Sequence, residues 1–117
     1  MRKMYHLGTC STCQRILKNV IKDADLEKQD IKVEKITSTQ LEQMKNLAGS
    51  YEALFSRRAQ KYRSRGLHEK ELSESDYRDL ILEEYTFLKR PVTIWDDQIF
   101  VGSAKKAVAE LADALAS

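Results

Sequence analysis

A short apolar segment near the N-terminus, Met4–Leu7, constrains the fold more than any other feature of this sequence. Gly8 and Thr9 end the segment, which is typical of a buried strand that runs into a loop. The helical spacing that follows predicts an amphipathic helix, with its apolar face formed by Ile16, Leu17, Val20 and Ile21. A second strand is expected where apolar and charged residues alternate, at Ile31, Val33 and Ile36. Since strand, helix and strand in this order normally form a right-handed crossover, the two strands should run parallel in one sheet.

The middle of the chain carries helical patterns. Thr39 with Glu42 matches a capping box at the start of one helix, and Ser73 with Asp76 matches a second one. Between them, residues 57–66 are dense in Arg and Lys, and we expect an exposed loop or a frayed helix there. Helices therefore fill the region between the N-terminal strands and the C-terminal ones.

Strand patterns return after Pro91, the only proline of the chain. Val92–Trp95 and Ile99–Val101 are rich in β-forming residues, and the Asp96-Asp97 pair between them predicts a hairpin turn. Ser103 can cap a last helix. The order β-α-β, helices, β-β-α predicts an α/β fold with a mixed four-stranded sheet flanked by helices. This is the thioredoxin-like arrangement, with a helical insertion between the N-terminal βαβ unit and the C-terminal ββα unit.

The length of 117 residues predicts a single domain, residues 1–117. A formal net charge of +2 gives no reason to expect direct binding to nucleic acid or to a membrane surface. No apolar stretch approaches the roughly 20 residues that span a bilayer, and no apolar run follows the basic start as it would in a signal peptide. We therefore expect a monomer in the cytoplasm, where disulfides are usually transient and catalytic.

Cys10 and Cys13 lie three positions apart, in the loop between the first strand and the first helix. In a cytosolic protein, such a pair beside a βαβ pattern is typical of a thioredoxin-like redox motif. The helix N-terminus, with Ser11 or Thr12 as its cap, would stabilise a nucleophilic Cys10 thiolate. Cys13 could then attack a mixed disulfide formed at Cys10. The weaker alternatives are two ordinary buried cysteines, or a zinc site completed by His6 and His68 without a second Cys pair.

Three segments in this order resemble the arsenate reductase (ArsC)/Spx/YffB family of thioredoxin-fold proteins. They are Tyr5–Cys10, Tyr51–Arg58, and Phe87–Val92 followed by Val101-Gly102, so that the resemblance covers nearly the whole chain. It implies that Cys10 is the nucleophile, that Arg90 binds the oxyanion or thiolate beside it, and that Pro91 is a cis-proline facing the cysteine. It also implies that no cofactor is bound and that an external thiol donor, glutathione with glutaredoxin or thioredoxin, resets the protein.

The sequence departs from the glutathione-dependent arsenate reductases in two places. Cys13 is present, as in Spx, and the middle arginine of those enzymes would fall at Ser56. Arg58 instead matches an arginine of the Spx and YffB branches. The resemblance places a histidine at His6, and Thr12 offers a hydroxyl and an N–H near Cys10. Thr12, Arg58 and His6 are therefore candidate anion-binding residues, although a cap, a solvated basic face and a core position explain them equally simply.

The sequence thus predicts a thiol-disulfide oxidoreductase in which Cys10 attacks an arsenate-like oxyanion, a protein disulfide or a glutathione adduct, and Cys13 resolves the intermediate. No metal is expected, and no flavin or nicotinamide either, because the chain lacks a glycine-rich dinucleotide fingerprint. The alternative is a redox-sensing, Spx-like transcriptional regulator that binds RNA polymerase through Ser56–Glu71 and the helix after Ser73. A catalytically silent relative is the third, weakest interpretation.

Overall fold

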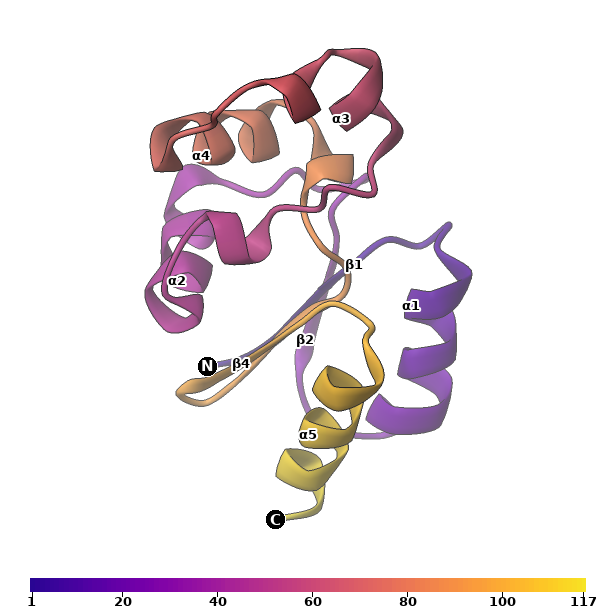
Figure 1. The fold of residues 1–117 in the computed structure, drawn as a ribbon. Coiled ribbons are helices and arrows are strands. Elements are labelled where there is room, and N and C mark those ends of the chain that lie inside the picture. The colour runs from indigo at the N-terminus through magenta and orange to yellow at the C-terminus, as the bar shows by residue number, and fades with distance from the viewer. The chain divides into compact units, whose positions relative to one another are not determined.

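The computed structural model describes all 117 residues, and the chain divides into two compact units. Unit 1 comprises Met1–Lys35 and Arg90–Ser117, and unit 2 comprises Ile36–Lys89. Unit 2 is the helical insertion between the N-terminal βαβ unit and the C-terminal ββα unit (Figure 1). That the whole chain forms a single domain stays a prediction.

Unit 1 is built on a four-stranded sheet with the order β2-β1-β3-β4. The central strand β1 (Arg2–His6) pairs in parallel with β2 (Glu27–Asp30) and antiparallel with β3 (Val92–Trp95). β3 in turn forms the expected hairpin with β4 (Gln98–Val101). The mixed sheet and its helices confirm the predicted thioredoxin-like fold class.

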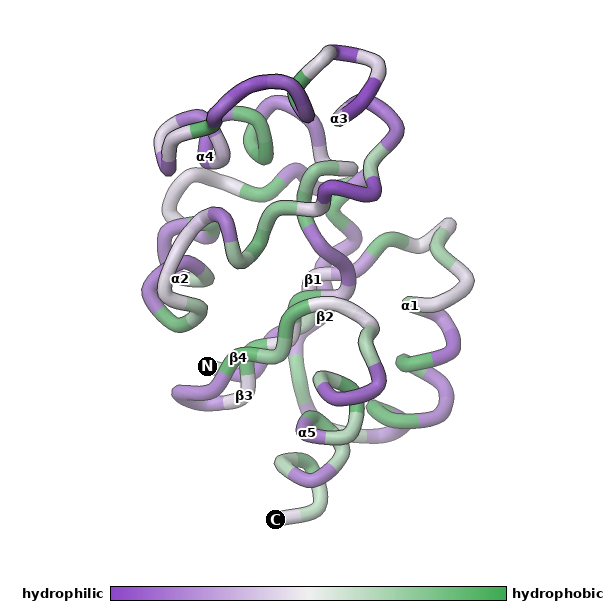
Figure 2. Tube along the Cα trace, in the orientation of Figure 1, coloured by the Kyte–Doolittle hydropathy of each residue, from purple (hydrophilic) through white to green (hydrophobic).

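Two helical segments pack side by side on one face of this sheet (Figure 1). The first is α1 (Ser11–Ile16), which continues as the π-helical turn η1 (Leu17–Ile21), and the second is α5 (Lys105–Ala116). Their shared core consists of Met4, Ile16, Ile21, Phe100 and Leu111. Figure 2 shows hydrophobic residues along β4 and a hydrophilic tip on the β3–β4 hairpin. None of the helices is long and apolar enough to cross a membrane.

The second strand lies earlier in the chain than predicted. β2 occupies Glu27–Asp30, whereas the alternating segment from Ile31 onward begins with a turn in which the Asp30 carbonyl accepts hydrogen bonds from two backbone N–H groups. Ile31 is buried in this turn, but Val33 is 84% exposed. β2 is an edge strand with four polar residues, so it depends on backbone pairing with β1 and has no apolar alternation to mark it.

The starts of the two helices in unit 1 also differ from prediction. Cys10 itself is the N-cap of α1, and its backbone is extended, so neither Ser11 nor Thr12 caps the helix. α5 begins after Ala104 without a side-chain cap, so the proposed cap at Ser103 is wrong. The backbone of α1 therefore leaves its first N–H groups available to the Cys10 side chain.

Unit 2 consists of helical segments around an aromatic core. Its main helices are α2 (Ser38–Ala48) and α4 (Glu74–Glu83), with the short α3 (Gln60–Ser64) between them. The 3-10 turns are η2 (Glu52–Leu54), η3 (Leu67–Glu69) and η4 (Tyr85–Phe87). The buried Phe55 ring stacks on Phe87 at a centroid distance of 5.1 Å and also meets Tyr62 and Tyr77.

The two capping predictions in unit 2 have opposite outcomes. Ser73 and Asp76 form the expected capping box at the start of α4. The box of α2 lies two residues earlier than predicted, because Thr37 accepts from the Gln40 backbone N–H and the Gln40 side chain accepts from Thr37. Thr39 is therefore a residue within the first turn of α2.

Candidate functional site

The loop after β1 turns the chain sharply into α1. The Cys10 N–H donates to the Leu7 carbonyl at 3.0 Å, and the Gln14 N–H donates to the Cys10 carbonyl at 3.1 Å. The first bond closes a turn over Gly8 and Thr9, and the second is the first hydrogen bond of the helix. Cys10 is thereby held where the chain changes from turn to helix, at the point where backbone N–H groups are exposed.

The Cys10 thiol is partly exposed and free of any disulfide. Burial would raise the pKa of Cys10, but several groups stabilise the thiolate and together lower the pKa below its ordinary value. In decreasing order these are the backbone N–H of Cys13, the Cys13 thiol, the backbone N–H of Thr12, and the positive charge of Arg90. The N-terminus of α1 thus favours the ionised, nucleophilic form of Cys10.

Cys13 has the opposite environment. It lies on the first turn of α1 and is completely buried, and it is also a free thiol. Burial raises the pKa of Cys13 to about 11, helped by its hydrogen bond to Cys10 and by the charge of Cys10, while the Leu7 backbone and Arg90 act in the other direction. The pair therefore holds a partly exposed thiol whose ionised form is favoured next to a buried thiol whose protonated form is favoured.

Arg90 and Pro91 directly precede β3, and they lie at the same end of the sheet as the Cys10 loop. The Arg90–Pro91 peptide bond is cis, and Pro91 is buried immediately before β3. Because Val92 pairs with Tyr5 in the antiparallel register, the start of β3 lies beside the end of β1 that leads into the Cys10 loop. The Pro91 carbonyl accepts a hydrogen bond of 2.8 Å from Gly102 after β4. The charge of Arg90 lowers the pKa of both thiols.

The other sequence-predicted residues of unit 1 contribute in different ways. Thr12 acts on Cys10 through its backbone N–H, not its hydroxyl. His6 is the last residue of β1, and its Nδ1 atom is buried without a hydrogen-bond partner. His6 is not among the groups that shift the pKa of either cysteine. Anion binding by Thr12 and His6 stays a prediction.

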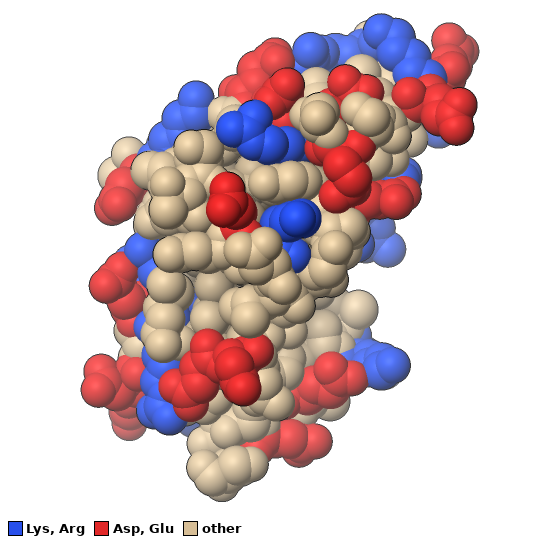
Figure 3. Space-filling view, turned by 90° about the vertical axis from the view of Figure 1, so that its left-hand side faces the viewer, with Lys and Arg blue, Asp and Glu red and all other residues tan.

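Arg58 belongs to unit 2, where it is exposed ahead of α3. Several of its basic neighbours are engaged with acidic residues of the same unit: Arg57 with Glu52 at 2.7 Å, Lys61 with Glu84, and Arg65 with Glu83 at 3.0 Å. On the face drawn in Figure 3, basic and acidic side chains are interspersed. A role for Arg58 in anion binding stays a prediction.

The structure also brings residues to the Cys10 loop that sequence reasoning missed. The Asp30 carboxylate accepts a hydrogen bond of 3.1 Å from the Gly8 N–H, and the Gln14 side chain donates one of 3.1 Å to the Gly8 carbonyl. Asp30 and Gly8 are 22 residues apart in the sequence, so no local motif marks this contact. The chain contains no group of three or more His, Cys, Asp or Glu residues able to hold a metal ion.

The comparison with protein families and the comparison with solved structures both find relatives of this chain. The model of the ArsC family matches residues 5–111. No curated protein sequence matches the chain. A solved structure described as a "possible arsenate reductase" from Streptococcus mutans is 26% identical, with a TM-score of 0.74, and the alignment covers 95% of this chain and 97% of that one.

Two further solved structures share the fold. One is SACOL0876 from Staphylococcus aureus, with 25% identity, a TM-score of 0.76, and coverage of 94% of this chain and 97% of that one. The other is an arsenate reductase from Vibrio cholerae, with 19% identity, a TM-score of 0.75, and coverage of 94% and 96%. The similarity extends over nearly the full length of each protein compared.

Proposed function

Since the chain belongs to the ArsC family, whose members include thiol-dependent oxidoreductases, we propose that Cys10 is its nucleophile and Cys13 its resolving cysteine. The observation that carries the proposal is the contrast between the two thiols. Cys10 is accessible and its pKa is lowered, whereas Cys13 is buried and its pKa is raised to about 11. A nucleophile must be ionised before the substrate arrives, and a resolving thiol can stay protonated until the mixed intermediate forms.

With a disulfide or glutathione adduct as substrate, the Cys10 thiolate attacks one sulfur and expels the other as a thiolate, which takes up a proton. Cys13 then loses its proton and attacks the Sγ atom of Cys10. The substrate thiol leaves, and a Cys10–Cys13 disulfide remains. Two electrons pass from the dithiol to the substrate. An external thiol donor, glutathione with glutaredoxin or thioredoxin in the cytoplasm, returns them.

With an arsenate-like oxyanion, Cys10 displaces an oxygen of the oxyanion as water and forms a sulfur–arsenic bond. Attack of Cys13 on Cys10 breaks that bond, so that arsenic leaves with two more electrons as arsenite and the same internal disulfide forms. Arg90, with Thr12, His6 and Arg58 as further candidates, would stabilise the bound anion by charge-assisted hydrogen bonds. The 26% identity to a protein described as a possible arsenate reductase supports this substrate class.

The test is a trapping experiment with full-length protein. In Cys13→Ser the intermediate at Cys10 cannot be resolved, so a mixed disulfide should accumulate with an oxidised thiol substrate and be released by dithiothreitol. Cys10→Ser is the matched control and should trap nothing. Trapping that is equal in the two variants, or absent from both, would contradict the assigned roles. Arsenite release by the wild-type protein, with each thiol donor in turn, then separates the substrate classes.

The alternative function, an Spx-like regulator that binds RNA polymerase, uses the same dithiol as a switch. It requires a stable complex whose affinity depends on the Cys10–Cys13 disulfide, and it requires no turnover. Binding of purified RNA polymerase to oxidised and reduced protein distinguishes it from the oxidoreductase. Multiple turnovers with a thiol donor, together with redox-independent or absent polymerase binding, favour the enzyme.

A further inference from the structure

The turn that presents Cys10 is held on both sides of one residue, Gly8. Its N–H donates to Asp30 Oδ2 at 3.1 Å, and its carbonyl accepts from Gln14 Nε2 at 3.1 Å. Asp30 is the last residue of β2, and Gln14 lies on α1. The two contacts therefore tie the turn to the edge strand on one side and to the helix on the other.

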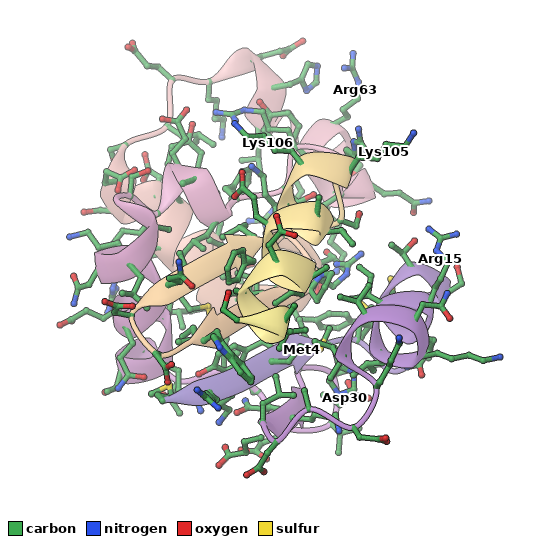
Figure 4. The ribbon with its side chains drawn as sticks, turned by 90° about the horizontal axis from the view of Figure 1, so that it is seen from below. Met4, Arg15, Asp30, Arg63, Lys105 and Lys106 are labelled. Carbon is green, nitrogen blue, oxygen red and sulfur yellow. The ribbon has the colours of Figure 1, made fainter.

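Asp30 is itself held in place for this contact. Its Oδ1 atom accepts a hydrogen bond of 3.0 Å from the Lys32 N–H, while Oδ2 accepts from Gly8. Its backbone is fixed next to His6 by the parallel pairing of β1 and β2. Figure 4 labels Asp30, the last residue of β2. A carboxylate with each oxygen bound to a backbone N–H is a rigid link between two segments of chain.

The glycine at position 8 is explained by the same contact. Its φ angle lies outside the left-handed range, so the backbone would accept an ordinary residue. A Cβ atom at this position, however, would lie 2.4 Å from Asp30 Oδ2. The Gly8–Asp30 contact, rather than the conformation of the turn, thus favours glycine here, because a Cβ atom would push the carboxylate away.

We propose that Asp30 is a positioning residue for the nucleophile: through the Gly8 N–H it fixes the Leu7–Cys10 turn, and so holds Cys10 over the N-terminus of α1. The groups that stabilise the Cys10 thiolate include the backbone N–H groups of Cys13 and Thr12, and such hydrogen bonds weaken steeply with small displacements. Asp30 is not among the charges that act on Cys10, so its effect comes through geometry. This inference rests on the proposed role of Cys10 as nucleophile.

The direction in which the pKa of Cys10 shifts when Asp30 is replaced distinguishes a positioning role from an effect of its charge. A carboxylate near a thiol disfavours the thiolate, so removal of its charge alone would lower the pKa of Cys10. Loss of the positioning contact would instead raise the pKa of Cys10 toward the value of a free thiol, about 8.5. The two explanations therefore predict opposite shifts in the same variant.

The experiment is a pH titration of thiolate absorbance and of alkylation rate, on reduced full-length protein, with a thermal melt of each variant. Asp30→Ala should raise the pKa of Cys10 and slow alkylation at neutral pH. Asp30→Asn removes the charge but keeps one acceptor oxygen, so it should restore part of the wild-type titration. Asp23→Ala, which removes an exposed carboxylate elsewhere in unit 1, is the matched control and should change nothing. A lowered or unchanged pKa of Cys10 in folded Asp30→Ala would overturn the proposal.

Gly8→Ala tests the same contact from the other partner. It should raise the pKa of Cys10 in the wild-type background, because the new Cβ displaces the carboxylate. In the Asp30→Ala background the obstacle is absent, so the same substitution should have little further effect. Equal shifts in both backgrounds would overturn the inference. A Cys10 pKa that is ordinary already in the wild-type protein would instead contradict the proposed function, and so the two failures are distinguishable.

Discussion

At one end of the sheet in unit 1, around the first residues of β1, charged side chains pair with one another. Arg2 binds Asp96 through two hydrogen bonds of 3.0 and 3.1 Å and lies over the Trp95 ring, and Lys3 pairs with Glu27 at 2.7 Å. At the other end, beyond the last residue of β1, backbone N–H groups and the charge of Arg90 converge on a thiol.

The comparison explains why we place the proposed chemistry at only one end of the sheet. Where each charge has an opposite charge beside it, the pair is satisfied and has little left to offer a ligand. At the Cys10 end, the stabilising groups act on a partly exposed thiol and lower its pKa below the ordinary value. Under the proposed function, the same β-strand carries a structural end and a reactive end.

The largest expected effect tests what the two ends share. Met4 lies in the middle of β1, is completely buried and belongs to the core between the sheet and the helices. Met4→Ala should lower the free energy of unfolding by about 2–5 kcal/mol, because it leaves a cavity there. Met4→Leu, which nearly conserves volume, should cost less than about 1.5 kcal/mol. Urea unfolding measures both, and a Met4→Ala loss no larger than that of Met4→Leu would contradict a common core.

The second prediction is specific to the reactive end and concerns alkaline pH. The pKa of Cys13 is raised to about 11, so its contribution to stability is complete below the unfolded value of about 8.5 and is lost as pH rises toward 11. Between pH 8.5 and 10 the reduced protein should lose roughly 1–2 kcal/mol, and Cys13→Ala should remove most of this slope. The lowered pKa of Cys10 works in the opposite direction but only below pH 8.5. Urea unfolding at both pH values is the measurement, and an equal slope in Cys13→Ala would contradict it.

An element of this fold can be predicted from the sequence when the pattern that marks it lies within a few neighbouring residues. The Cys10 loop and the hairpin could be predicted, because short apolar runs bounded by turn residues mark them. β2 could not, because an edge strand with the sequence Glu-Lys-Gln-Asp is held by backbone pairing with β1 rather than by apolar burial. Residues 57–66, expected as a loop or a frayed helix, contain the five-residue helix α3.

In the candidate site, too, some residues are marked by the sequence and others are brought in only by the fold. Cys10 and Cys13 are visible as a motif, and Arg90 and Pro91 through the family resemblance. The Asp30 contact is formed only when β2 pairs beside β1 and brings its last residue next to the turn. A residue whose function depends on long-range pairing leaves no periodic or spaced pattern in a single sequence. The environment of Cys13, which decides its raised pKa, likewise depends on burial that spacing does not reveal.

A smaller effect is expected from Arg90, whose charge is the weakest of the named groups that stabilise the Cys10 thiolate. Arg90→Ala should raise the pKa of Cys10. The increase should be smaller than the one that would follow the loss of the hydrogen bonds from the Cys13 and Thr12 backbone N–H groups. Arg90→Lys keeps the charge but not the planar fork, so the thiolate should be largely preserved while oxyanion binding weakens. Thiolate titration and arsenate inhibition of alkylation measure the two effects. An unchanged Cys10 titration in Arg90→Ala would remove Arg90 from the reactive end.

The smallest effect is expected at the structural end, in Glu27→Gln. This substitution leaves the shape of the side chain but removes the charge that pairs with Lys3 at 2.7 Å. The Lys3 side chain is only 11% exposed but that of Glu27 is 69% exposed, and an ion pair with one partner in solvent contributes about 0–1 kcal/mol. We therefore expect a loss of stability within that range, which shrinks further as salt screens the pair in the wild-type protein.

The same variant gives the sharpest check on the separation of the two ends. Glu27 contributes to the raised pKa of Tyr5, after burial, so the pKa of Tyr5 should fall in Glu27→Gln, while the pKa of Cys10 should not move. Ultraviolet titration follows the phenolate and the thiolate in one sample. A Cys10 shift as large as the one in Arg90→Ala would mean that charges at the two ends act on each other along β1. The division into a structural and a reactive end would then be wrong.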